Sequence, residues 1–305
     1  MSAVSELARE ERAAGMWERM KARVSAGYAL RIYLPASILA EHIRAYFRRR
    51  RGTTTAASSR RLACLPWSRI LKGRRIRLVE TQKHDGNVRV SELALLAQIA
   101  AAVPPGSDIV EIGTFDGRTT LNLAVNAARG VSIATLDLPA SDRPALAVEE
   151  SERRYIDKPR PGARLRACGE PWSTYAGRVA QLHGDSATFD WSSRYGRAGL
   201  VFVDGAHSYE YARKDSETAM RLVQAEGVVV WHDYGVWPGV TQALEELEAE
   251  RRLGLCHIRG TSLVIWRSPA VNRVPERDAG QVDGDGLELA PTEVSDEFVR
   301  SSALG

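Results

Sequence analysis

The feature that most constrains the fold is a regular alternation, between residues 80 and 268, of short apolar β-rich runs with longer helical patterns. Continuous apolar strands that are each followed by a helix are typical of a parallel sheet covered on both faces. We therefore predict an α/β fold with a doubly wound, mostly parallel, seven-stranded sheet. The expected strands are 108–113, 131–138, 178–184, 199–205 and 227–233, with a closing hairpin over 255–267; the expected helices are 91–103, 118–129, 208–224 and 238–253.

The charge of the chain is distributed unevenly. Residues 1–79 hold 18 Lys and Arg against 5 Asp and Glu, residues 80–268 hold 21 against 25, and residues 269–305 hold 3 against 8. We therefore divide the chain into a basic helical extension over 1–70, an α/β domain over 80–268 and an acidic tail over 269–305. The tail is polar and nearly free of aromatic residues, a composition that predicts disorder.

The basic extension suggests contact with a surface. Residues 1–24 form a polar helical pattern, and residues 25–47 are predicted to form two amphipathic helical pieces that meet at Pro35. Four arginines follow at 48–51, and then a linker at 53–59. An apolar helix beside arginines is typical of a membrane surface, so residues 25–51 are a candidate for membrane-surface contact. The alternative is packing on the chain's own domain or on a second subunit, which leaves a homo-oligomer open.

Composition excludes several classes of protein. The three cysteines contain no C-x-x-C pair, which excludes a disulfide scaffold and a zinc ribbon and favours a reducing compartment. The N-terminal residues show no apolar signal core, and no run has the length of a membrane span. We expect a cytoplasmic protein, peripheral to the membrane if the extension binds there. The sequence shows no RNA motif, which argues against a nucleic-acid partner.

The turn after the first expected strand has the properties of a ligand-binding loop. Gly113 and Gly117 permit a tight strand-to-helix turn and close approach of a ligand to the backbone. Glu111, just before this turn, would repel a diphosphate, so we expect a ligand with a positively charged amine. Asp137 ends the next strand, where a carboxylate accepts from ribose hydroxyls, and Asp185 follows the third. Carboxylates at successive strand ends predict a nucleoside pocket.

A second group of residues follows the fourth and fifth expected strands. Asp204 ends the fourth strand, His207 follows three residues later, and His232 and Asp233 end the fifth. Because these two strand ends are expected to be neighbours, Asp204, His232 and Asp233 form a candidate metal site. An imidazole suits later transition metals better than Mg²⁺, which prefers oxygen. The alternative is that the two acids are hydrogen-bond acceptors and His232 is a stacking group.

Five segments carry a resemblance to a known family. They are VEIGTFDGRTTLNLA (110–124), ATLDLP (134–139), LHGDSATF (182–189), LVFVDGAHSYEYARKD (200–215) and GVVVWHDY (227–234). Together they resemble class I S-adenosylmethionine-dependent methyltransferases, in particular the small-molecule O-methyltransferases with a D-G-x-H-x-Y-E segment and an H-D pair. The resemblance covers roughly residues 80–268 and implies a Rossmann-like fold and S-adenosylmethionine as cofactor.

The resemblance also implies roles for individual residues. The expected cofactor-binding residues are Glu111, Gly113, Thr114, Phe115, Gly117, Asp137, Leu138, Asp185 and Ser186. In related metal-dependent enzymes the position of His207 is the general base, and acids after the fourth and fifth strands bind Mg²⁺. Asp204 is expected to orient His207. His232 departs from that pattern, which leaves the identity and the presence of a metal open.

We therefore predict methyl transfer to a hydroxyl of a small molecule, with a sugar or glycosylated metabolite as the leading acceptor. The alternatives are a catechol or phenol O-methyltransferase, and a membrane- or nucleic-acid-associated protein that uses the fold as a scaffold. The long connection over 139–177 is expected to select the acceptor, with Tyr155, Trp172 and Tyr175 as stacking residues. Trp231, Tyr234 and Trp237 are expected on the opposite wall.

Overall fold

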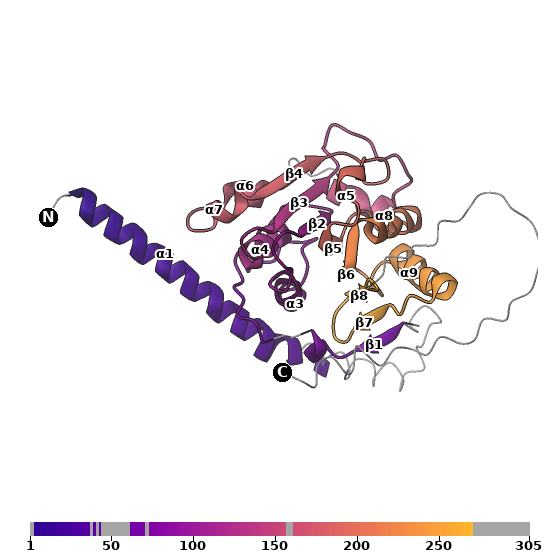
Figure 1. The fold of residues 1–305 in the computed structure, drawn as a ribbon, viewed down its shortest axis with the longest axis horizontal. Helices are drawn as coiled ribbons and strands as arrows, with labels where there is room; N and C mark the ends of the chain where they lie inside the picture. Colours follow the sequence, from indigo (N-terminus) through magenta and orange to yellow (C-terminus); the bar gives the residue numbers. More distant parts are fainter. Residues whose placement is uncertain are drawn as a thin grey trace, which may run out of the picture.

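The computed structural model describes residues 3–36, 39–40, 43, 62–70, 73–156 and 161–270, with side chains from residue 15 onward. Its centre is an eight-stranded sheet in the order β1-β7-β8-β6-β5-β2-β3-β4, in which β8 alone among the described strands runs antiparallel to its neighbours (Figure 1). The strands are β1 Ala63–Leu65, β2 Asp108–Ile112, β3 Ser132–Asp137, β4 Val179–His183, β5 Ala198–Val203, β6 Val223–Trp231, β7 Cys256–Ile258 and β8 Val264–Arg267. The predicted doubly wound, mostly parallel sheet is confirmed.

Helices cover both faces of this sheet. The main ones are α3 Val90–Ala100, α4 Arg118–Asn126, α8 Tyr209–Leu222 and α9 Pro238–Arg251; short helices in the long connection are α5 Arg153–Ile156, α6 Ala163–Ala167 and α7 Ser173–Ala176. Side chains alternate along each strand, so β2 places Ile109 in the core with α3 and α4 and places Val110 and Ile112 in the core with α8 and α9. Burial on both faces explains why the central strands are continuously apolar.

Over residues 3–36 the described part of the N-terminal extension is continuously helical, where two pieces that meet at Pro35 were predicted. Helix α1 (Ala3–Tyr28) continues into the π-helical turn η1 (Ala29–Tyr33), in which Leu34 N–H donates to the Ala29 carbonyl oxygen. Pro35 follows at once. A proline ring clashes with the carbonyl group four residues earlier, and a wider π-turn relieves that clash without ending the helix. The predicted break at Pro35 is therefore wrong within the described residues.

The extension is also not entirely helical. Residues 63–65 form β1, which pairs in parallel with β7 and adds an eighth strand at the edge of the sheet. The predicted linker at 53–59 and the arginines at 48–51 lie outside the described residues, as does the acidic tail from residue 271. Among the helices that the structure describes, none combines the length and the apolar character needed to cross a membrane.

Candidate active site

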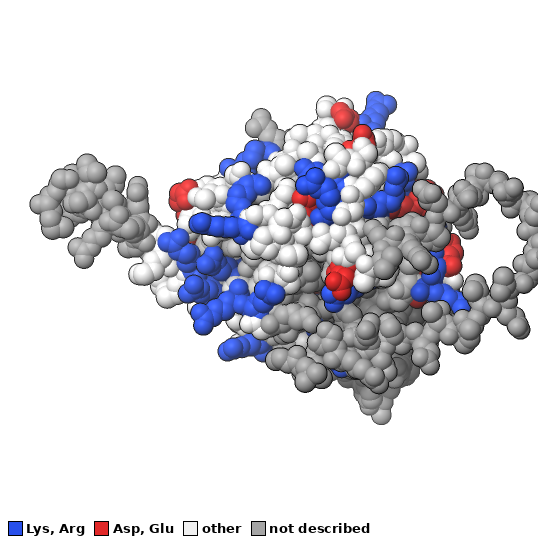
Figure 2. Space-filling model, viewed as in Figure 1, with Lys and Arg blue, Asp and Glu red and all other residues white. Residues whose placement is uncertain are grey.

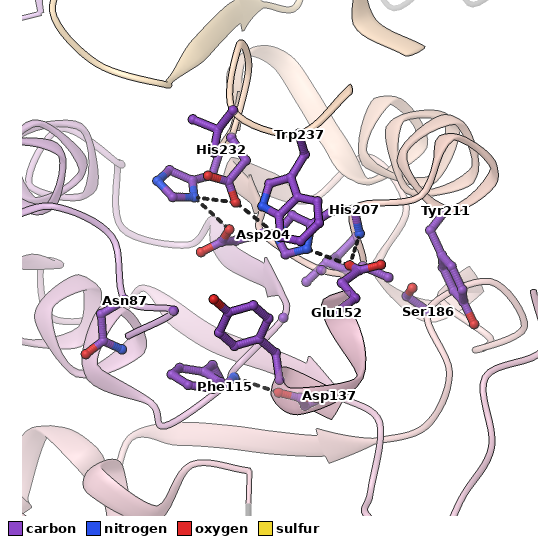
Figure 3. A pocket seen from close by; sticks show the side chains of 18 of the residues that line it. Asn87, Phe115, Asp137, Glu152, Ser186, Asp204, His207, Tyr211, His232 and Trp237 are labelled. Carbon is purple, nitrogen blue, oxygen red and sulfur yellow. Dashed lines mark hydrogen bonds and ion pairs between the residues drawn. The ribbon is translucent and has the colours of Figure 1, made fainter. Parts of the chain in front are cut away.

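A pocket of about 680 Å³ opens at the carboxyl ends of the parallel strands. Its walls come from the segment before α3, from the ends of β2, β3, β5 and β6, from the loop after β4 and from residues 260–262. In open α/β sheets ligands bind at this edge, where the strand order reverses. Here the reversal lies between β2 and β5, and the residues at these ends meet in the pocket (Figure 3).

The structure places most of the predicted cofactor residues in the pocket wall. Six of the nine line it: Gly113, Phe115, Asp137, Leu138, Asp185 and Ser186. The other three, Glu111, Thr114 and Gly117, lie beneath the wall. The predicted catalytic and metal-site residues, His207, Asp204, His232 and Asp233, all line it as well.

Glu111 does not face the pocket. Its side chain is completely buried and accepts hydrogen bonds from the hydroxyls of Thr120 on α4 and Thr135 on β3, the latter at 2.6 Å. Burial raises the pKa of this carboxyl to about 8, against the two hydroxyl bonds that lower it. Glu111 therefore lies under α4. The predicted contact between its carboxylate and the amine of a ligand is not supported by this position.

The glycine turn lies close to other segments of the chain, whereas the sequence predicted close approach of a ligand there. Gly113 has φ +99°, and a Cβ there would lie 1.9 Å from the carbonyl oxygen of Asp204. Gly117 begins α4 with φ +88°, and its Cβ would lie 2.6 Å from the Cβ of Leu165. Gly113 therefore lets the ends of β2 and β5 touch, whereas Gly117 leaves room for helix α6 and does not line the pocket.

Two carboxylates connect the pocket wall near β3 and β4 to neighbouring segments. Asp137 Oδ2 accepts from the backbone N–H of Phe115 at 2.6 Å, which ties the end of β3 to the glycine turn. Asp185 Oδ2 accepts from the Tyr211 hydroxyl at 2.5 Å and from the backbone N–H of Ala145 at 2.7 Å. Asp185 thus connects the loop after β4 with α8 and with the long connection.

His207 lies between two carboxylates. Its Nδ1 is 2.5 Å from Glu152 Oε1, its Nε2 is 2.8 Å from Asp233 Oδ2, and Glu152 also accepts from its backbone N–H. The ring stacks on Trp237, with centroids 4.6 Å apart and planes 13° apart. Burial lowers the pKa of His207, but the hydrogen bonds to Asp233 and Glu152 outweigh it and raise the pKa to about 9. The predicted orienting residue, Asp204, is not one of these two partners.

His232 is surrounded by three acids. Its Nδ1 lies 2.9 Å from Asp204 Oδ1 (Figure 3). The same nitrogen lies 3.2 Å from Asp233 Oδ2, and Nε2 lies 3.3 Å from Glu92 Oε2. Burial acts to lower the pKa of His232, but the charges of Asp204 and Asp233 raise it well above its ordinary value. A protonated ring donates to carboxylates from both nitrogens, which explains how these acids lie together in a buried site.

The comparisons with known proteins bear on this site directly. Residues 110–234 match a family described as a methyltransferase domain. This segment is a methyltransferase domain. It contains every site residue that the sequence predicted, from Glu111 to Asp233, together with Glu152. The resemblance to class I methyltransferases is thereby confirmed. A search of curated proteins gives no match.

Solved structures resemble the methyltransferase domain in fold. The O-methyltransferase NovP is 18% identical, with a TM-score of 0.44 over 59% of this chain and 81% of that chain. An O-methyltransferase from Bacillus cereus in complex with SAH is 16% identical, with a TM-score of 0.41 over 63% and 84%. TomG from Streptomyces achromogenes, an O-methyltransferase in complex with SAM, is 19% identical, with a TM-score of 0.40 over 66% and 89%. Likenesses this weak assign no substrate.

Sequence analysis missed two acids that the methyltransferase site contains. Glu92, on α3, is fully buried and accepts from the backbone N–H of Ser262 at 2.8 Å as well as facing His232. Glu152 lies in the long connection, 55 residues before its partner His207. Neither follows a strand, so the strand-end rule did not find them. Glu92 stands at the third position of α3, where an acid commonly accepts from the backbone N–H before the helix, as it does here from Arg89. That position predicts a helix start and gives no indication of a catalytic role.

The predicted aromatic walls are confirmed only in part. Tyr155 and Trp237 line the pocket of the methyltransferase domain. Trp172 and Tyr175 pack in a separate cluster with α4, and Trp231 and Tyr234 are buried in the core below the site. Most of the expected stacking residues are therefore ordinary core.

Proposed function

We propose that this methyltransferase transfers a methyl group from S-adenosylmethionine to a hydroxyl of a small molecule, with a sugar or glycosylated metabolite as the first acceptor class to test. The observation that carries the proposal is the position of His207: it lines the pocket, and its ring is held by Glu152, Asp233 and Trp237. An aliphatic hydroxyl is a weak nucleophile until a base removes its proton.

The residues that line the cofactor half of the pocket suit this carrier. When bound, S-adenosylmethionine supplies an activated methyl group on its sulfonium. Asp137, at the end of β3, offers a carboxylate to the ribose hydroxyls, and Gly113 lines the pocket beside the methionine part. Asp185 and Ser186 border the region where the adenine lies in this proposal.

Glu152 and Asp233 bind different nitrogens of His207 and have different roles. Glu152 accepts from Nδ1–H of His207, so it fixes the tautomer in which Nε2 is the proton acceptor. Asp233 occupies Nε2 at 2.8 Å, at the position that an acceptor hydroxyl takes for proton transfer. The acceptor therefore displaces Asp233 from His207, and Asp233 turns fully to His232, whose Nδ1 is already 3.2 Å away.

The residues at this point fit a divalent cation. Asp204, His232 and Asp233 each offer one ligand atom, and these atoms lie within 4.8 Å of one another. Glu92 faces the second nitrogen of His232, as carboxylates do behind metal-bound histidines. A set of two carboxylates and one imidazole suits Mn²⁺ or Zn²⁺ better than Mg²⁺. A cation here would stabilise the developing alkoxide.

The test compares His207→Gln with wild type in a methyl-transfer assay with saccharide and catechol acceptors. We expect a saccharide to be methylated, the variant to lose about 10²–10⁴-fold in kcat, and cofactor affinity to be unchanged. Full activity of the variant would remove the base assignment. Methylation of catechols but not saccharides would favour the catechol alternative. The structural basis of that alternative is that Phe115, Tyr155 and Trp237 line the pocket and offer contacts to an aromatic ring.

Metal assistance is tested separately by exhaustive chelation and by Asp204→Asn. We expect chelation to lower kcat, Mn²⁺ to restore it, and Mn²⁺ to raise the Tm of wild type but not of the variant. Activity that chelator leaves unaltered would remove the cation and leave the role of His207 standing.

A further inference from the structure

The N-terminal helix presents an apolar stripe to the outside. Nearly all the large hydrophobic side chains that are exposed in the described part of the chain lie between residues 16 and 43. Met16, Met20, Val24, Tyr28 and Ile32 follow one another at intervals of four, and Trp17 lies beside them. Each interval of four turns the helix by about 40°, so these side chains form a row that winds slowly over its exposed half. Met16 and Val24 are each 68% exposed, so this face is not covered by the domain.

The opposite face of the same helix is anchored. Ala22, Ala26 and Ala29 are buried against the domain, and the Ala22 carbonyl oxygen accepts from the backbone N–H of Leu78 at 2.9 Å. Small side chains let the helix lie close to the body, and the hydrogen bond fixes its position. The exposed stripe, which we call the outer face (residues 16–32), is therefore held in a fixed orientation.

Cations border the outer face. Arg19, Lys21, Arg23 and Arg31 are exposed there, and the acid of this stretch, Glu18, is only half-exposed and pairs with Lys21. Within the described residues no carboxylate pairs with Arg19, Arg23 or Arg31. Figure 2 shows Lys and Arg side chains gathered where α1 meets the body. The outer face thus joins an apolar stripe to unneutralised positive charge.

We propose that the outer face binds the surface of an anionic lipid bilayer, with the apolar stripe in the interface and the arginines on the headgroups. Trp17 and Tyr28 are the aromatic types that favour the boundary between headgroups and acyl chains. The outer face overlaps the predicted contact at residues 25–51 over residues 25–32 and extends it back to Met16.

The charges argue against the other occupants. A second copy packed on the same face would bring three unpaired arginines against three more, which costs free energy at an interface. Nucleic acid would take the arginines but leave Met16, Met20 and Val24 in water. An anionic bilayer removes the apolar side chains from water and also binds the arginines beside them.

The test is sedimentation of the full chain with vesicles. We expect binding to vesicles of equal parts phosphatidylglycerol and phosphatidylcholine, much weaker binding to phosphatidylcholine alone, and loss of binding in Met20→Glu/Val24→Glu. Removing three charges, in Arg19→Gln/Arg23→Gln/Arg31→Gln, should weaken binding about 100-fold, at about fivefold for each cation near an anionic surface. None of these residues touches the methyltransferase site, so the result is independent of the activity.

The matched control removes three exposed arginines from α8, α9 and β8, as Arg221→Gln/Arg251→Gln/Arg267→Gln, and should bind as wild type does. Equal weakening by both triple variants would overturn the proposal, because total charge and not the outer face would then decide binding. Absence of binding would also overturn it. So would a dimer in solution that Met20→Glu/Val24→Glu dissociates, since a second copy would then occupy the face.

Discussion

Glu152 and Asp233 bind opposite sides of the His207 ring. The two acids differ in whether they have another partner when their bond to His207 is broken. Asp233 shares its charge with His232, 3.2 Å away, so it has a second partner. Glu152 is buried and bonds both the ring and the backbone of His207. We infer that Glu152 is the permanent partner of the base and Asp233 the exchangeable one.

This division predicts a pH dependence. A base acts in its neutral form, and the pKa of His207 is raised to about 9 in the free protein, where Asp233 is bonded to the ring, so kcat/KM should rise with pH up to about 9 and then level off. Glu152→Gln replaces a charged acceptor that raises this pKa by a neutral one. The rise should therefore move to lower pH, and the plateau should fall because the bond that orients the ring is weaker. The measurement is kcat/KM against pH.

The control for this experiment is Glu150→Gln, an exposed acid two residues earlier in the same connection, whose side chain pairs with Arg153. It should leave the profile unchanged. A rise that stays in place in Glu152→Gln, or moves to higher pH, would contradict the role given to Glu152.

At the scale of elements, the glycine turn after β2 decides whether the site can form. Gly113→Ala would place a Cβ 1.9 Å from a backbone oxygen of β5's end, which no side-chain movement relieves. Gly106→Ala is the matched control, because φ there is +88° but a Cβ meets nothing within 4 Å. We expect the control to cost about 1–2 kcal/mol of backbone strain and Gly113→Ala to cost more than about 4 kcal/mol. Urea unfolding measures both. Similar losses would refute the close approach.

The same scale shows what the sequence could predict. The five expected strands before the hairpin appear because central parallel strands are continuously apolar, and the strand-end acids meet because parallel strands end at one edge. β1 has three residues and no hydrophobic period, so only its pairing with β7 defines it. Glu111 was misplaced because alternation along β2 turns it toward α4, two residues before the strand reaches the pocket. Glu152 joins His207 through tertiary contact alone.

At the scale of the whole molecule, helix α1 extends from the body as an arm (Figure 1), and the burial of its side chains differs between its two faces. Ala26 is buried against the domain and Val24 is exposed on the outer face. Ala26→Glu should therefore lower the Tm by several degrees, because a charge is buried without a partner. Val24→Glu should leave the Tm unchanged to within about 1 °C, since surface substitutions change stability little. Calorimetry of both variants decides between a docked and a detached arm; equal Tm values would indicate that the inner face is not docked.

The account depends on a methyl carrier that lies across the ends of β2 and β3, and calorimetric titration with S-adenosylmethionine tests this most directly. We predict a dissociation constant of about micromolar order, weakened about 10–100-fold in Asp137→Ala by loss of hydrogen bonds to a charged acceptor. Asp142→Ala, an exposed acid on the same connection, should bind as wild type does. Absence of binding in wild type, or equal affinity in Asp137→Ala and Asp142→Ala, would contradict the account.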